Sequence, residues 1–415
     1  MTGSGTIRAF TLGIDPEGRD KRALEERIGL FWRAVGDVVL GEGWTLRSRR
    51  IVLPLVNARP RFSLQNLNAL VAWLRDVAAS SDVRWFDVPF TTFVDGAIEP
   101  HFDAALEVVQ RYPMAFVNFV VAVGGRIERR GILHAARFIR SVSRLSRNGY
   151  DNFRVGATCN GVANTPFFPF SMHDGADGFS VALEQPALMQ EVASACKGMD
   201  LAATRERLLE ALVPSLREVE RVALGVERLS GIGYLGTDVS LAPYPDEHGS
   251  VARVLETLGA QGYGSSGTLF LTAFLTDVLR AAVGRSGIRT VGFNGVMASL
   301  LEDPRIAEHS DLRTLGIDSL ISFASVCGCG LDMVPIPGDT YEEEIASIIL
   351  DVAAMSCALR KPLGVRLLPI PSRRENEFTD FAHDFISNCR IVGVKNRVFD
   401  PRSFSGQFEF LTTRV

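Results

Sequence analysis

The stretch "TIRAFTLGI", residues 6–14, decides the fold because it begins a regular alternation of strand and helix. Its continuous apolar and β-branched character predicts a buried strand. The spacing of apolar residues and the glycine and serine boundaries predict the elements that follow: helix 20–43, strand 46–56, helix 63–82 and strand 83–93. This β-α-β-α-β order is typical of layered α/β proteins.

The same alternation continues to the C-terminal part of the chain. It predicts strands at 114–123, 153–160, 178–184 and 363–371, and helices at 130–145, 201–229, 267–284 and 340–361. We expect the helix at 201–229 to be interrupted at Pro214, and the helix at 340–361 to start with a capping box of Thr340 and Glu343.

Neither a repeat nor a low-complexity linker divides the chain. One continuous α/β unit is therefore expected, with residues 1–110 as a small N-terminal α/β lobe and residues 111–415 as the main body.

Composition excludes several classes of protein. The 415 residues carry a formal net charge of −4, which disfavours a nucleic-acid partner. The longest apolar run, residues 114–123, is too short to span a bilayer, so no membrane partner is expected. The first residues lack the pattern of a signal peptide, and six cysteines in so long a chain do not form a disulfide framework. We therefore expect a cytoplasmic protein with reduced thiols.

The stretch "SFASVCGCGLDMVPIPGDTYEEE", residues 322–344, holds the strongest candidate for chemistry. Cys327 and Cys329 flank Gly328, and a glycine-rich loop can expose a thiol and favour its thiolate. The spacing of the cysteines fits a zinc site poorly. The alternative is that both cysteines are small apolar fillers of a tight loop.

Four other loops contain candidate residues. Asn164 and His173 lie in a proline-rich loop, where His173 is a natural proton carrier or, alternatively, a hydrogen-bonded structural histidine. Asp238 and Ser240 follow three glycines and form either a ligand loop or an Asx turn. Asn294 belongs to a turn that leads to Glu302 and Asp303, two adjacent acids that we expect to point in different directions, with Pro304 ending or bending a helix.

The fourth of these loops, "GYGSSG" at residues 262–267, matches the glycine pattern of dinucleotide-binding sites. The residues before it predict a helix rather than the required strand. The sequence therefore contains no NAD or FAD signature.

Five of these motifs together resemble one known family. The segments "IRAFTLGI", "NTPFFPFSMHDG", "GTDVSLAP", "FNGVMASLLED" and "SVCGCGLDMVPIPGD" occur in the same order as in the domain-of-unknown-function 711 family, over residues 6 to about 370. The resemblance implies a pyruvate formate-lyase-like α/β barrel, in which a cysteine on a finger loop reaches the barrel centre. It places Cys327 at the finger position, with His173, Asp238, Asp332 and Asp339 as pocket residues. Cys329 and Asn294 depart from the family's usual pattern, which is compatible with a specialised biosynthetic pathway.

The leading hypothesis is an enzyme acting on a small carbonyl- or amino-acid-like metabolite. Cys327 would act as nucleophile or acid/base, and His173 would relay a proton. Asp332 or Asp238 would orient that histidine, and Arg366 would hold a substrate carboxylate. The sequence leaves open the reaction class, the cofactor, the metal content and whether the chain forms a homo-oligomer.

Two alternatives use the same fold. A metabolite- or metal-binding regulator would use Cys327, Cys329, His173 and Asp332 as ligands. A glycyl-radical enzyme would use Gly406 with Arg402, but the spacing and Gln407 disfavour it.

Overall fold

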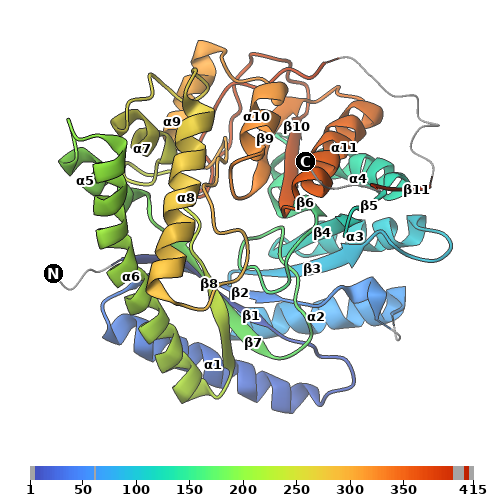
Figure 1. The fold of residues 1–415 in the computed structure, drawn as a ribbon. Helices are drawn as coiled ribbons and strands as arrows, with labels where there is room; N and C mark the ends of the chain where they lie inside the picture. The colour runs from blue at the N-terminus through green and yellow to red at the C-terminus, as the bar shows by residue number, and fades with distance from the viewer. Residues whose placement is uncertain (1–4, 60–61, 396–405, 411–415) are drawn as a thin grey trace.

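A large mixed sheet forms the centre of the protein (Figure 1). The computed structural model describes residues 5–59, 62–395 and 406–410. The strands are β1 (Thr6–Gly13), β2 (Thr45–Val52), β3 (Trp85–Thr91), β4 (Ala115–Val123), β5 (Arg126–Glu128), β6 (Val155–Cys159), β7 (Gly178–Glu184), β8 (Gly233–Asp238), β9 (Gly330–Pro337), β10 (Leu363–Ile370) and β11 (Gln407–Glu409). They follow the order β8-β7-β1-β2-β3-β4-β6-β10-β9, with β5 and β11 paired beside β4. Most neighbouring strands along this order are parallel.

Helices lie around the outside of the strands (Figure 1). The α-helices are α1 (Lys21–Gly41), α2 (Leu64–Ser80), α3 (Glu99–Arg111), α4 (Arg129–Val142), α5 (Pro186–Ala195), α6 (Leu201–Ser230), α7 (Val251–Thr257), α8 (Thr268–Ser286), α9 (Pro304–His309), α10 (Ile317–Ala324) and α11 (Glu342–Leu359). Short 3₁₀ helices are η1 (Val56–Ala58), η2 (Tyr150–Arg154) and η3 (Ser310–Leu312). Because side chains on both faces of the sheet are covered, β1, β3 and β10 are almost entirely buried, which explains their continuous apolar sequences.

The two ends of the strand order are linked by a segment outside the named strands. Residues 290–299 make parallel bridges to both sides: Thr237 with Thr290, Leu241 with Val296, and Ser299 with Asp332. The segment thus lies between β8 and its extension on one side and β9 on the other.

The predicted α/β alternation is confirmed. Ser63 caps α2 as expected, because its side chain accepts a hydrogen bond from the Asn66 N–H at 3.1 Å. Asp20 caps α1 in the same way. These caps satisfy backbone donors that the first helical turn leaves free, so the local sequence alone fixes where these helices begin.

Two expectations about helices are wrong. Helix α6 continues through Pro214 without interruption. Leu212 and Leu216 are buried on either side of this proline, and packing against α1 and α8 outweighs a local cost of about 3 kcal/mol. The capping box of α11 lies one residue later than predicted, because the Tyr341 N–H donates to the Glu344 carboxylate while the Thr340 hydroxyl donates to the Pro337 carbonyl.

Other segments expected to be loops or helices also differ. Residues 233–238 and 330–337, treated as loops, form β8 and β9. Pro304 starts α9 instead of ending or bending a helix, because proline has no N–H to lose at the first helical position.

An aromatic loop between β6 and β7 packs against several strands of the sheet. The Pro166 carbonyl accepts hydrogen bonds from the Thr11 hydroxyl and from the Arg50 guanidinium. A Cβ added at Gly156 or Gly364 would meet the Phe170 ring at 2.8 or 2.5 Å, so these two strand glycines make room for the loop.

The cysteine-bearing loop is held by a close backbone contact. The Gly328 N–H donates to the Val296 carbonyl at 2.5 Å, and a Cβ added at Gly295 would meet the Gly328 backbone at 2.9 Å. Any side chain at either glycine would therefore push the loop away from the segment 290–299.

We expect Gly295→Ala to lower the free energy of unfolding by about 2 kcal/mol or more, because backbone atoms cannot move aside as side chains do. The matched control is Gly284→Ala in the last turn of α8, where no atom lies within 4 Å of an added Cβ. That control should be neutral or stabilising by about 0.5–1 kcal/mol. Urea unfolding of both variants measures the difference, and equal stabilities would contradict the close-contact interpretation.

Candidate active site

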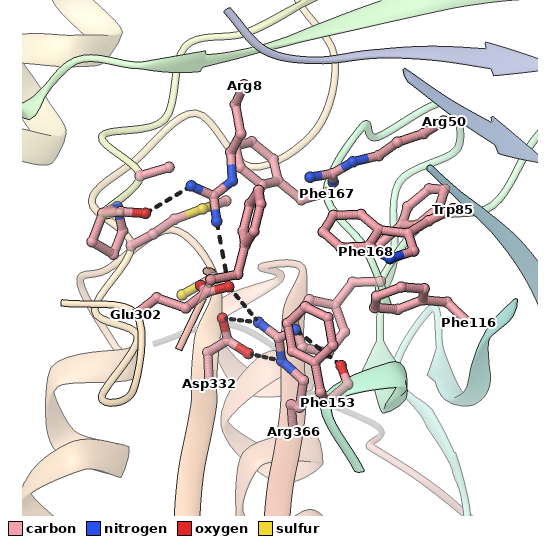
Figure 2. A pocket seen from close by; sticks show the side chains of 16 residues that line it. Arg8, Arg50, Trp85, Phe116, Phe153, Phe167, Phe168, Glu302, Asp332 and Arg366 are labelled. Carbon is pink, nitrogen blue, oxygen red and sulfur yellow. Dashed lines mark hydrogen bonds and ion pairs between the residues drawn. The ribbon is translucent and has the colours of Figure 1, made fainter. Parts of the chain in front are cut away.

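A buried cavity rich in arginine lies within the strands (Figure 2). Its wall combines charged groups, one thiol and a group of aromatic rings. The charged and thiol residues are Arg8, Arg50, Arg366, Glu302, Asp332 and Cys329. The aromatic residues are Trp85, Phe116, Phe153, Phe167, Phe168, Phe170 and Phe385. The volume open to the centre of a water molecule is about 20 Å³, which is enough for about one water.

Four of these residues form a continuous chain of ion pairs (Figure 2). Arg366 holds Asp332 with two hydrogen bonds of 2.7 and 2.9 Å, the fork geometry that guanidinium and carboxylate groups favour. Glu302 lies between two arginines, 3.5 Å from Arg366 and 3.3 Å from Arg8. The Arg366 fork, expected to hold a substrate carboxylate, is thus occupied by Asp332.

Arg50 differs from the other two arginines. It is 3% exposed and donates to the Ser48 hydroxyl and the Pro166 carbonyl, and no carboxylate in the described part of the chain pairs with it. Burial, followed by the charge of Arg8, lowers the pKa of Arg50 to about 9, so the group stays charged at neutral pH. Glu302 and the buried Asp87 interact with Arg50 electrostatically but form no ion pair with it. A buried cation without a direct ion pair is costly, and an anionic ligand would lower that cost.

The segment after β10 covers the cavity with Phe385. The ring lies 5.3 Å from the Arg8 guanidinium and 4.9 Å from that of Arg84, and it meets the Trp85 ring edge-on at 5.0 Å. Stacked guanidinium and aromatic groups of this kind also suit a planar ligand. A metabolite larger than water can enter only if rings such as Phe385 move.

The two cysteines lie side by side below this cavity. Both are 1% exposed; Cys329 lines the arginine cavity, whereas Cys327 lines a smaller neighbouring cavity. The Gly330 N–H donates to the Cys327 sulfur at 3.3 Å. The loop therefore places the Cys329 thiol directly at the arginine cavity. Cys327 can interact with that cavity only through Cys329.

The pKa values of the two thiols are shifted in opposite directions. A hydrogen bond from Cys329 outweighs burial and, with the charge of Lys361, lowers the pKa of Cys327 to about 6. The same contact and burial raise the pKa of Cys329. At neutral pH the arrangement is a Cys327 thiolate that accepts a hydrogen bond from the Cys329 thiol.

His173 belongs to a separate cluster at the ends of β1 and β2. Its Nδ1 lies 2.8 Å from the Asn164 side-chain oxygen, and its ring lies over Gly13. Burial lowers the pKa of His173. In the described residues, no hydrogen bond or ion pair joins His173 to the cysteines, Asp332 or Asp238. The structure instead brings His173 together with Asn164, another candidate of the same loop.

Asp238, Ser240 and Asn294 form a third group, which holds backbone segments together. Asp238 accepts hydrogen bonds from the Ser240 hydroxyl and from the N–H groups of Phe293 and Asn294 at 2.6–3.2 Å. Burial raises the pKa of Asp238. Asp339 lies exposed in the turn after β9, away from these groups.

Three charged residues of the arginine cavity were not among the sequence candidates: Arg8, Arg50 and Glu302. A lone arginine inside an otherwise apolar strand, as in "TIRAFTLGI", is the pattern that could have indicated Arg8, because burying a charge demands a partner. Arg50 belongs to the basic run "RSRR", residues 47–50, and so lacks this signal. Glu302 and Asp303 do point in different directions, as predicted. Glu302 faces Arg8 and Arg366, while Asp303 caps α7 and α9.

The described ranges contain neither a metal site nor a membrane-spanning helix. Within the described ranges no group of three or more His, Cys, Asp or Glu residues could hold a metal ion. No helix in the same part of the chain has both the length and the apolar character needed to cross a bilayer. Gly406 lies exposed next to β11, and Arg402 falls outside the described residues.

With a mixed α/β fold and a buried arginine–thiol site in place, comparison with known proteins gives the family. The family model "Uncharacterised ACR (DUF711)" matches residues 5–387, and the chain belongs to this family. The resemblance seen in the sequence motifs is thereby confirmed.

Relatives carry the name UPF0210 protein. One from Pelotomaculum thermopropionicum is 28% identical over 413 residues, which cover 94% of this chain and 90% of the relative. Another from Clostridium perfringens is 28% identical over 90% of this chain and 88% of its own length. A third from Pyrobaculum arsenaticum is 29% identical over 70% of this chain. The matches to the Pyrobaculum relatives span about half to two thirds of those proteins, from 51% to 66%.

Replacing Arg366 and replacing Arg50 should change the free energy of unfolding in different ways. Arg366→Met leaves Asp332 buried without its partner and should lower the free energy of unfolding by about 3–5 kcal/mol. Arg50→Met removes an unpaired buried charge and should leave stability within about 1 kcal/mol of wild type, or raise it. Denaturant unfolding checks both, and a large loss in Arg50→Met would show that Arg50 has a structural counter-charge.

The thiol pair predicts a pH-dependent thiolate. Ultraviolet absorbance should show one thiolate titrating near pH 6, compared with 9.0 for an ordinary cysteine. Because the folded pKa is the lower one, the stability from this group is complete above pH 9 and is lost as the pH falls toward 6. Cys327→Ser should abolish the step, and Cys329→Ala should move it to higher pH by removing the main hydrogen bond. A step unchanged in both variants would contradict this assignment.

Proposed function

We propose that this protein is a cytoplasmic enzyme that binds a small carbonyl-containing carboxylate in the arginine cavity and acts on it with the Cys327–Cys329 pair. The single observation that carries the proposal is Arg50, a buried cation without a carboxylate partner in the described residues, in the same cavity as the Cys329 thiol. Arg8 pairs with Glu184 and Glu302, and Arg366 pairs with Asp332 and Glu302, so among the described residues Arg50 is the arginine of this cavity that has no ion pair.

We further propose that the sheet closes into an α/β barrel of the pyruvate formate-lyase type. The bridges from residues 290–299 to β8 and to Asp332 support closure, since they join the two ends of the strand order. The cysteine loop then has the place of the finger loop, which its contact with Gly295 supports.

In the proposed enzyme, the role of each residue follows from its place in the cavity. Arg50 holds the carboxylate, and the aromatic wall excludes water from the reacting carbon. Cys329 contacts the ligand as proton donor, and Cys327 is the thiolate that restores or withdraws that proton or acts as nucleophile. Proton relay through His173 stays a prediction, as does the division of the chain near residue 110.

A regulator that binds the same ligand without turnover is the alternative, and the closed cavity is compatible with it. A space of about 20 Å³ fits a protein whose conformation changes on ligand binding as well as it fits an enzyme between turnovers.

Binding of pyruvate and phenylpyruvate, compared with their neutral methyl esters, tests the proposal. Calorimetry should show that the wild type binds at least one of the acids about tenfold or more tightly than its ester, since a charge-assisted hydrogen bond to Arg50 contributes about 1.5–3 kcal/mol. Arg50→Met should lose this preference. Arg49→Met is the matched control, because Arg49 is the next residue of β2 and contacts the Ser81 carbonyl on the other face.

Turnover then separates the enzyme from the regulator. Proton NMR of the bound acid should show chemical change or proton exchange in the wild type and its loss in Cys327→Ala. Binding without any change would favour the regulator, and equal binding of acid and ester would overturn the role of Arg50.

A further inference from the structure

Both thiols of the cysteine loop lie beside the same backbone carbonyl oxygen. Residues 327–329 form a bend, and the sulfurs of Cys327 and Cys329 lie 3.7 and 3.9 Å from the same oxygen, the Gly330 carbonyl. The Cys329 thiol also lowers the pKa of Cys327, which places the two groups in electrostatic contact. A disulfide between cysteines separated by one residue requires a tight bend with both side chains on one side, and the bend at residues 327–329, with both sulfurs beside one carbonyl oxygen, is compatible with it.

A second cavity beside the pair is the size of a water molecule. It has an accessible volume of about 10 Å³ and is lined by Cys327, Tyr263 and mainly apolar residues. The Tyr263 side chain is almost fully buried, and its hydroxyl has no hydrogen-bond partner among the described residues. A buried hydroxyl normally has a partner, so this one indicates a small polar molecule next to the Cys327 sulfur.

We propose that Cys327 and Cys329 form a redox couple that hydrogen peroxide oxidises to a disulfide, with the peroxide held by Tyr263 in this cavity. Hydrogen peroxide is the smallest peroxide and carries the same kinds of donors and acceptors as water, so of all peroxides it needs the least widening of this cavity. The inference shares the thiol pair with the proposed enzyme but needs neither its carboxylate ligand nor its turnover.

The chemistry balances with peroxide as the only oxidant. The Cys327 thiolate attacks one peroxide oxygen; an S–O bond forms, the O–O bond breaks, and hydroxide leaves with a hydrogen bond from Tyr263. That hydroxide takes the Cys329 proton and becomes water. The Cys329 thiolate then attacks the Cys327 sulfenic acid, the S–S bond forms, and the second oxygen leaves as hydroxide. Two sulfurs are oxidised and one peroxide is reduced.

Mass spectrometry of the intact folded chain after hydrogen peroxide treatment tests the proposal. The expected result is the loss of two hydrogen atoms, reversed by dithiothreitol, with peptide mapping that joins Cys327 to Cys329. In Cys329→Ser the sulfenic acid at Cys327 should persist and react with dimedone. If that variant does not fold, the peptide map of the wild type decides alone.

The rate of disulfide formation tests the cavity. Tyr263→Phe should slow it about tenfold, the value of one hydrogen bond near 1.4 kcal/mol. Tyr234→Phe is the control and should leave the rate unchanged, because that buried hydroxyl is already bonded to Thr237. The bulkier tert-butyl hydroperoxide should react at least about tenfold more slowly with the folded chain.

Three results would overturn the inference: a disulfide that maps to other cysteines such as Cys159 and Cys357, an unchanged rate in Tyr263→Phe, or equal rates for the two peroxides. None of them bears on carboxylate binding by Arg50, so failure here and failure of the proposed function are distinguishable.

Discussion

The buried chain of charges from Arg8 through Glu302 and Arg366 to Asp332 is the interaction on which the site depends. It connects β1, the segment before α9, β10 and β9, which are far apart in the sequence. In a low-dielectric interior each charge must have a partner, so these elements can pack together only in the arrangement that pairs them. Arg50 differs from these residues, because it forms no ion pair in the described chain and donates instead to the Ser48 hydroxyl and the Pro166 carbonyl.

Close backbone packing is the second constraint. Gly295 against Gly328 and the ring of Phe170 against Gly156 and Gly364 leave no space for side chains at these glycines. These contacts bring the cysteine loop and the aromatic loop to opposite sides of one cavity. The protein thereby combines an arginine, aromatic rings and a thiol pair in a site closed to bulk water, where electrostatic effects on a bound anion are strong.

The thiol pair joins the two proposals. The lowered pKa of Cys327 favours a thiolate that acid–base or nucleophilic chemistry can use, and both sulfurs lie beside the Gly330 carbonyl oxygen, where the proposed disulfide would form. A chain with both properties would lose its thiolate on oxidation. Hydrogen peroxide would then control how much of the Cys327 thiolate is available to act on the carboxylate ligand.

The sequence by itself determined the alternation of strands and helices, the cap at Ser63, the cysteine loop and the family, because these depend on contacts between residues close in the chain. Sequence patterns predicted the cap of α11 one residue too early and predicted a break in α6 at Pro214. The structure differs there because packing between helices outweighs local preference. The sequence could not show that Arg8, Arg50 and Glu302 converge with Cys329, or that His173 lies in a different cluster. Only the tertiary structure decided this, because the partners of a buried charge are set by strand order and packing between residues hundreds of positions apart.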